Sequence, residues 1–174
     1  MYSDPNSVKR ISSLGAGPIG GGWTAHFLAR GYDVTAYLHD KSETNSFMSI
    51  LKTAWVSLAE LGLAPSASMD RLRIVTDLEE ALDGADFVQE SGPERIEVKQ
   101  KLYSEMGKIL PPSIIIGSST SGLMMSDIQS DCSTPERTVI GHPFNPPYLL
   151  PLVEIVGGKR TAPEAVSWAG EFYK

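Results

Sequence analysis

A chain of 174 residues is long enough for one domain with a substantial core and short for two, so we expect residues 1–174 to form a single domain. Its 41% hydrophobic and 21% charged residues are typical of a folded globular protein. A formal net charge of -6 without Lys or Arg clusters argues against a nucleic acid or an anionic membrane as partner. No apolar run approaches membrane-spanning length, the N-terminus lacks a signal-peptide pattern, and the single Cys132 cannot form an internal disulfide. These features predict a cytoplasmic protein, and we expect no metal site.

Short β-rich runs alternate with longer helical patterns along the chain, which is typical of βαβ units. Strands are expected at residues 8–14, 33–38, 72–75, 87–89, 114–116, 139–140 and 152–156. Helices are expected at residues 19–30, 43–61, 96–110 and 163–172, with a short one capped by Thr76 and running through Ala81. The pattern therefore predicts an α/β fold with a doubly wound, mainly parallel sheet.

A glycine-rich segment connects the first predicted strand to the first predicted helix. Gly15, Gly17 and Gly20 follow the spacing Gly-x-Gly-x-x-Gly, with Ala16, Pro18 and Ile19 between them. In this context the first glycine allows a tight turn, the second lets the backbone approach a pyrophosphate, and the third allows the helix to pack closely on the strand. The helix N-terminus adds N–H donors and a positive dipole. We therefore predict a Rossmann-type domain that binds NAD, the alternative being a turn that serves only packing.

The residue that should bind the adenosine ribose departs from this pattern. A carboxylate usually ends the second strand, but that position holds Leu38, which cannot accept a hydrogen bond. Asp40 lies two residues further and could replace it if the loop folds back. His39 and Lys41 would instead favour the 2′-phosphate of NADP. NAD with Asp40 at the ribose remains the prediction, and NADP the alternative.

A histidine and a glutamate near the end of the chain form the second candidate site. His142 lies in a proline-rich segment after a predicted strand, where ligands bind at the edge of a parallel sheet. Glu154 lies in an otherwise apolar strand, and a carboxylate buried there would need a partner. A glutamate that holds the imidazole in one tautomer would let His142 accept a hydroxyl proton near neutral pH. Taken singly, His142 could be a structural loop histidine and Glu154 an outward-facing strand residue.

These residues belong to segments that resemble the 3-hydroxyacyl-CoA dehydrogenase family, from Lys9 to Tyr173. The matching segments are LGAGPIG at 14–20, QESGPE at 89–94, SSTS at 118–121 and HPFNP at 142–146, together with the 12-residue separation of His142 and Glu154. The resemblance implies that His142 and Glu154 are the catalytic pair.

The resemblance also implies roles for four further residues. Ser121 would contact the substrate oxygen and support the histidine, and Asn145 would face both substrate and cofactor. Glu94 and Lys99 would line the nicotinamide ribose side of the NAD site. Each residue has a structural alternative: Ser121 as a turn residue, Asn145 as an Asx turn before proline, and Glu94 with Lys99 as a charge pair at a helix start.

The family resemblance implies the class of substrate and partner as well. Residues 41–70 hold only two basic residues, Lys41 and Lys52, where acyl-CoA enzymes carry a longer basic hairpin, so a small free hydroxy acid is expected. The family also has a C-terminal helical domain that completes the pocket and forms a homodimer. This chain lacks that domain and stops within its last predicted helix, so we expect it to be a fragment of a longer polypeptide. The alternative from another class is a non-catalytic dinucleotide-binding or structural protein.

Overall fold

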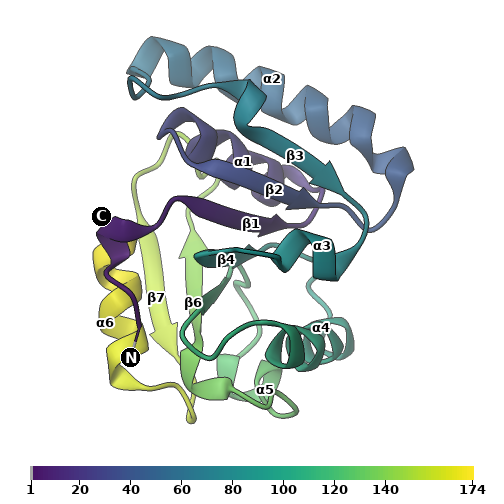
Figure 1. The fold of residues 1–174 in the computed structure, drawn as a ribbon, viewed down its shortest axis with the longest axis vertical. Coiled ribbons are helices and arrows are strands. Elements are labelled where there is room, and N and C mark those ends of the chain that lie inside the picture. Colours follow the sequence, from purple (N-terminus) through teal and green to yellow (C-terminus); the bar gives the residue numbers. More distant parts are fainter. Residues whose placement is uncertain (1) are drawn as a thin grey trace.

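The computed structural model describes residues 2–174, which form one seven-stranded sheet covered by helices (Figure 1). The strands are β1 Arg10–Leu14, β2 Asp33–Tyr37, β3 Leu72–Val75, β4 Phe87–Glu90, β5 Ile115–Ser118, β6 Thr138–Pro143 and β7 Val153–Gly157. Their order is β3-β2-β1-β4-β5-β6-β7, and every neighbouring pair is parallel except β6 with β7. The chain reverses its direction of winding between β1 and β4, which is the Rossmann arrangement. The predicted fold class is confirmed.

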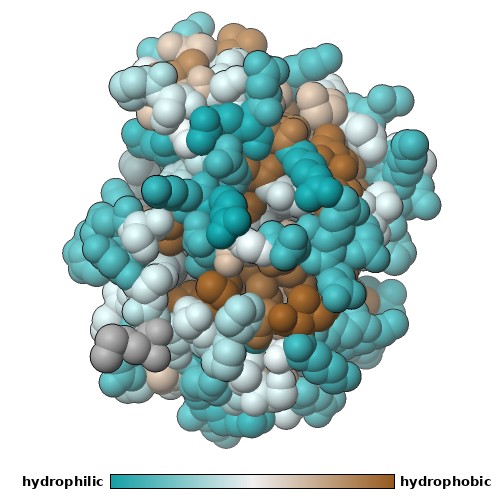
Figure 2. Space-filling model, viewed as in Figure 1, coloured by the Kyte–Doolittle hydropathy of each residue, from teal (hydrophilic) through white to brown (hydrophobic). Residues whose placement is uncertain are grey.

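Helices pack on both faces of the sheet and divide the core in two. They are α1 Pro18–Ala29, α2 Thr44–Leu61, α3 Leu78–Leu82, α4 Ile96–Ile109, α5 Met125–Ile128 and α6 Pro163–Phe172. Side chains of α1, α2 and α6 share one buried cluster, and those of α3, α4 and α5 share the other. Most of the face drawn in Figure 2 is hydrophilic, with hydrophobic residues visible mainly in hollows between elements. No helix in the described part of the chain is long and apolar enough to cross a membrane.

Two local predictions were wrong, and one short helix was not predicted. The short helix α3 is capped by Asp77 rather than Thr76, because the Asp77 carboxylate accepts a hydrogen bond from the Glu80 N–H at 2.8 Å. Strand β6 extends to Pro143, so His142 lies in a strand and not in a loop, because β7 pairs with β6 from Val139 to Pro143. The single-turn helix α5 was not expected, since it has no side-chain cap to mark its start.

One histidine of α1 is largely enclosed by the core. His26 lies beside the rings of Trp23 and Phe27, and its Nδ1 is buried without a hydrogen-bond partner among the described residues. Burial, helped by the nearby Arg30 guanidinium, lowers the pKa of His26 to about 4. The imidazole is therefore neutral in the folded protein at physiological pH.

This burial predicts a specific loss of stability in acid. Above pH about 6.5 the His26 imidazole is neutral in both the folded and the unfolded state. Between pH about 6.5 and about 4 only the unfolded chain takes up a proton on His26, so the free energy of unfolding falls as the pH is lowered through this range. The loss should approach about 3 kcal/mol. Urea unfolding of the wild type and of His26→Leu at pH 7.0, 5.5 and 4.5 measures it. The variant should lose less stability than the wild type over this interval, and parallel losses would contradict the assignment.

Candidate active site

The glycine loop connects β1 to α1 at the point where the sheet reverses its winding. Gly15 has a φ of +124°, and a side chain there would collide with the main-chain carbonyl of Ser91. A side chain at Gly20 would collide with the Gly15 carbonyl, so this glycine keeps α1 close to the loop. Gly17 differs, because the space that its Cβ would occupy is empty to 4 Å.

The start of α1 is suited to an anion. Gly17 is the N-cap and offers no side-chain hydrogen bond, and the first N–H groups of a helix have no acceptor within the helix itself. Because the space beside Gly17 is open as well, a pyrophosphate could approach these donors, as it does in dinucleotide-binding loops. The glycine loop thus fits the predicted cofactor.

The ribose end of the site has no carboxylate at the usual position. Leu38 follows β2 with 0% of its surface exposed, and it belongs to the hydrophobic core. Asp40 is exposed, and its carboxylate accepts a hydrogen bond from the Ser42 N–H at 2.7 Å while Glu43 accepts one from the Asp40 N–H at 3.1 Å. The hydrogen bonds from Ser42 hold the pKa of Asp40 below its usual range. Asp40 is therefore a charged group near this end of the loop, and its bond to ribose remains a prediction.

His142 and Glu154 face each other across the β6–β7 pair. They are register partners in the antiparallel ladder, and His142 Nδ1 lies 2.8 Å from Glu154 Oε2. The predicted pairing is therefore present. The expectation that Glu154 is buried was wrong: its side chain is 57% exposed, because β7 is the edge strand of the sheet. The His142 side chain is 26% exposed, and its Nε2 makes no hydrogen bond within residues 2–174.

A cavity of about 240 Å³ lies beside this pair. Its lining residues are Ile19, Ser119, Ser121, His142, Pro143, Phe144 and Asn145. The cavity thus brings together the N-terminus of α1, the loop after β5 and the loop after β6, which are far apart in sequence. Four of the predicted site residues meet there. Ser119 was not predicted, although its place in the Ser-Ser-Thr-Ser segment could have drawn attention to it.

Glu94 organises the loop after β5. Its carboxylate accepts hydrogen bonds from the Thr120 hydroxyl, from the Ser121 N–H at 3.0 Å and from the Gly122 N–H at 2.9 Å. Burial works to raise the pKa of Glu94, but these hydrogen bonds and Lys99 hold it below its usual range. Glu94 therefore fixes the backbone at Ser121, and its predicted contact with the cofactor stays a prediction.

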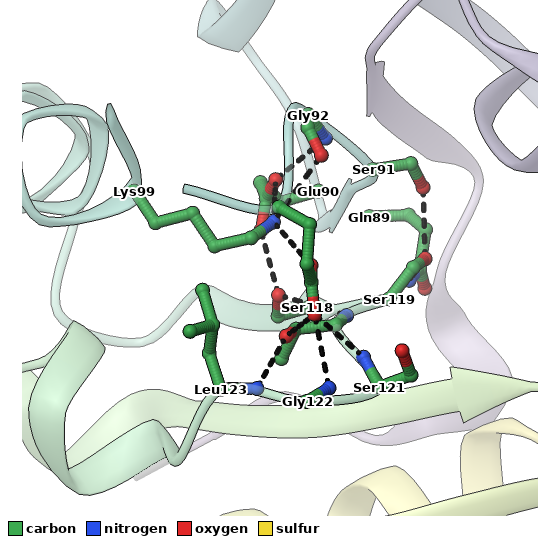
Figure 3. Close-up of polar contacts among 12 residues, drawn as sticks. Gln89, Glu90, Ser91, Gly92, Lys99, Ser118, Ser119, Ser121, Gly122 and Leu123 are labelled. Carbon is green, nitrogen blue, oxygen red and sulfur yellow. Dashed lines mark hydrogen bonds and ion pairs between the residues drawn. The ribbon is translucent and has the colours of Figure 1, made fainter. Parts of the chain in front are cut away.

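Lys99 is buried and paired with Glu90, a partner that the sequence did not predict. Figure 3 shows its ammonium paired with the Glu90 carboxylate. The nitrogen–oxygen distance is 2.7 Å, and the two side chains are 1% and 0% exposed. Glu90 also accepts hydrogen bonds from the Gly92 N–H at 2.6 Å and the Ser118 hydroxyl at 2.6 Å. Lys99 is 3.9 Å from Glu94 and so joins it to this network. The pair connects α4 to the ends of β4 and β5; a role of Lys99 at the cofactor stays a prediction.

The buried pair predicts a strongly non-additive double substitution. Lys99→Met should destabilise the fold by about 3–5 kcal/mol, because Glu90 is left as a buried charge without its counterion. Lys99→Met with Glu90→Gln should recover part of that loss, since the charge is removed with its partner. Urea unfolding of the wild type, both single variants and the double variant measures the coupling. Additive losses would contradict the pairing.

Gly17 allows folding and cofactor binding to be separated. In Gly17→Ala the new methyl group meets no protein atom, so thermal stability should be kept, yet the methyl projects where a pyrophosphate would approach. The affinity for NAD should fall by about tenfold or more. Calorimetric titration with NAD measures it, with Gly170→Ala as the matched control, since Gly170 in α6 is equally open. Unchanged affinity in Gly17→Ala would argue against this loop as the pyrophosphate site.

Comparison with known proteins agrees with this geometry. Residues 10–174 match the family described as 3-hydroxyacyl-CoA dehydrogenase, NAD binding domain. The chain belongs to the 3-hydroxyacyl-CoA dehydrogenase family. The predicted family resemblance is confirmed, and NAD is the cofactor of this family domain.

Individual family members show the extent of the likeness. The chain is 50% identical to L-carnitine dehydrogenase of Streptomyces coelicolor over 172 residues, which are 99% of this chain and 54% of that protein. The structure of 5-formyl-3-hydroxy-2-methylpyridine 4-carboxylic acid 5-dehydrogenase, an NAD-dependent dismutase, superposes with a TM-score of 0.87 at 32% identity, covering 95% and 54% of the two chains. The 3-hydroxybutyryl-CoA dehydrogenase of Escherichia coli gives a TM-score of 0.87 at 29% identity, covering 96% and 36%. The chain thus spans about half the length of the first two of these proteins and about a third of the length of the last.

Proposed function

We propose that this chain is the cofactor-binding part of an NAD-dependent dehydrogenase that oxidises the 3-hydroxyl of a small hydroxy acid. The observation that carries the proposal is that His142, held by Glu154, lines the same cavity as Ser121, Asn145 and Ile19 at the start of α1. A proton acceptor, polar groups for the substrate and the cofactor loop therefore share one small space.

In the proposed reaction the protein moves one proton and positions the substrate. Glu154 accepts the Nδ1 proton of His142, which leaves Nε2 unprotonated and directed away from Glu154. Nε2 takes the proton of the substrate hydroxyl, while Ser121 and Asn145 hold its oxygen as the carbonyl forms. When bound, NAD supplies the hydride acceptor.

L-Carnitine, giving 3-dehydrocarnitine, is the substrate that we propose. The supporting observations are the 50% identity to an L-carnitine dehydrogenase and the scarcity of basic residues in 41–70, where only Lys41 and Lys52 occur. A trimethylammonium group would bind against an aromatic face. Phe144 is 40% exposed in the cavity wall, with its ring centroid 6.1 Å from that of His142, and Tyr148 lies four residues further. A 3-hydroxyacyl-CoA and L-gulonate are the alternative substrates.

A second candidate function is non-catalytic dinucleotide binding or a structural role. The buried Leu38 at the ribose position favours it, because it removes an interaction that usually anchors the cofactor. Tight NAD binding by a protein that oxidises none of these substrates would support it. A homodimer, a cytoplasmic location and a longer parent polypeptide are further parts of the proposal.

His142→Gln tests the proposed base. In the polypeptide of the complete reading frame, assayed with L-carnitine and NAD by absorbance of NADH, this variant should lose turnover by about 100-fold or more, since general base catalysis contributes this much. Its NAD affinity, measured by calorimetry, should be unchanged. Retained turnover would rule out His142 as the base.

Glu154→Gln should lower kcat at least about tenfold, because the amide cannot hold the same tautomer. Glu164→Gln, an exposed residue in α6, is the matched control and should behave as wild type. If the unsubstituted protein does not oxidise L-carnitine but does oxidise 3-hydroxybutyryl-CoA or L-gulonate, that compound is the substrate instead.

A further inference from the structure

A second polar chain, separate from the His142–Glu154 pair, reaches the same cavity from the other side of the sheet. The Tyr173 hydroxyl donates a hydrogen bond to Gln89 Oε1, and Gln89 Nε2 donates to Ser119 Oγ at 2.9 Å. Ser119 Oγ is in turn bonded to Ser91 Oγ (Figure 3), at a distance of 2.8 Å. Ser119 also lines the cavity. This series of hydrogen bonds therefore extends from the end of α6, through β4, to the wall of the candidate active site.

The sheet leaves room for this tyrosine. A side chain at Gly117 in β5 or at Gly141 in β6 would collide with the Tyr173 hydroxyl, and neither glycine has a positive φ that would otherwise require it. Two neighbouring strands thus carry glycine where the phenol crosses them. Gln89 itself is 0% exposed, so its amide has no access to water.

The chemistry of these side chains fixes which group donates and which accepts in each hydrogen bond. Gln89 Oε1 can only accept, so Tyr173 is the donor, and burial raises the pKa of the Tyr173 phenol so that it stays protonated. With its carbonyl occupied, the Gln89 amide presents NH₂ to Ser119. The flipped amide would leave the phenol proton without an acceptor, because no other partner of this hydroxyl is found in residues 2–174.

Because Gln89 donates to Ser119, the Ser119 hydroxyl keeps its own proton for another hydrogen bond. A hydroxyl has one proton and two lone pairs, so Ser119 can accept from Gln89 and from Ser91 and still donate its own proton. Its backbone is fixed as well, since the Ser119 N–H donates to the Glu90 carbonyl at 2.7 Å. Ser119 lines the cavity, so a ligand bound there is within reach of a hydroxyl that still has a proton to donate.

We propose that Ser119 donates a hydrogen bond to an acceptor oxygen of the bound ligand, and that Gln89 and Tyr173 are positioning residues that keep Ser119 a donor. The acceptor is a carbonyl or carboxylate oxygen. The nicotinamide carboxamide is the first candidate, because Ser91, which is bonded to Ser119, lies against the glycine loop. The Ser91 N–H donates to the Leu14 carbonyl at 2.7 Å, and a side chain at Gly15 would collide with the Ser91 carbonyl. The carboxylate of a hydroxy acid is the second, and that assignment alone rests on the function proposed above.

Titration with NAD and with ADP-ribose, which lacks the nicotinamide, tests the proposal on the 174-residue protein. Ser119→Ala should weaken NAD binding by about fivefold, the effect of one lost hydrogen bond, and leave ADP-ribose binding unchanged. If instead both affinities stay at wild-type values and the KM for the hydroxy acid rises about fivefold in the polypeptide of the complete reading frame, the acceptor is the substrate carboxylate. Equal weakening of NAD and ADP-ribose, or no change in any of the three measurements, would overturn the proposal.

A double-mutant cycle tests the positioning role. Tyr173→Phe lets the Gln89 amide turn, so that Ser119 must donate to Gln89 and no longer to the ligand. The single variant should match the loss of Ser119→Ala, and the double variant should lose no more than either. Tyr2→Phe, which removes a phenol bonded to the Glu136 carbonyl, is the matched control and should bind as wild type. Additive losses, or wild-type binding in Tyr173→Phe, would overturn the role of Tyr173. His142→Gln is a separate test, so failure of the proposed base leaves this result unaffected.

Discussion

The carboxylate of Glu90 is the constraint on which the site depends. A charge that is 0% exposed at the end of β4 must be fully paired, because an unpaired buried ion costs several kcal/mol. Its partners are Lys99 from α4, the Gly92 N–H and the Ser118 hydroxyl at the end of β5. One side chain thus fixes the relative positions of two strand ends and a helix. Those strand ends lie between β1, which leads into the glycine loop, and β6, which carries His142.

The same need for pairing extends outward from this charge. Lys99 also lies near Glu94, whose carboxylate gathers the Thr120, Ser121 and Gly122 donors. Ser121 therefore reaches the cavity on a loop whose backbone is already ordered by charge-assisted hydrogen bonds. Preorganisation of this kind is what a site needs to hold a developing carbonyl without moving its own dipoles.

The parts of the site that the sequence predicts are those set by short spacings. The glycine loop follows a recognisable strand within a few residues, and a strand–turn–strand separation of 12 residues brings His142 opposite Glu154. The exposure of Glu154 could not be predicted, because apolar neighbours in the sequence do not show that β7 is an edge strand.

The polar chain through Gln89 could not be predicted for a different reason. Tyr173 is 84 residues from Gln89, and Gln89 is 30 residues from Ser119, so only the strand order brings them together.

Leu38 illustrates a third limit. The sequence shows that a carboxylate is missing after β2, but only the packing shows that the side chain enters the core and leaves Asp40 as the exposed charge.

Cofactor binding and turnover place different demands on these residues. The glycine loop, the start of α1 and the Glu90 network are built entirely from residues 10–123, and they require nothing beyond the described sheet. The proposed base is less protected, since its partner Glu154 is 57% exposed. The end of β6, β7 and the segment between them also carry exposed apolar residues, namely Phe144, Leu150, Leu152 and Val156. A hydride transfer needs water excluded from the reacting carbon. The electrostatic hold of Glu154 on His142 is also weakened by solvent at this exposure. We therefore expect NAD binding to be a property of these 174 residues alone, whereas efficient turnover requires that the β6–β7 face be covered.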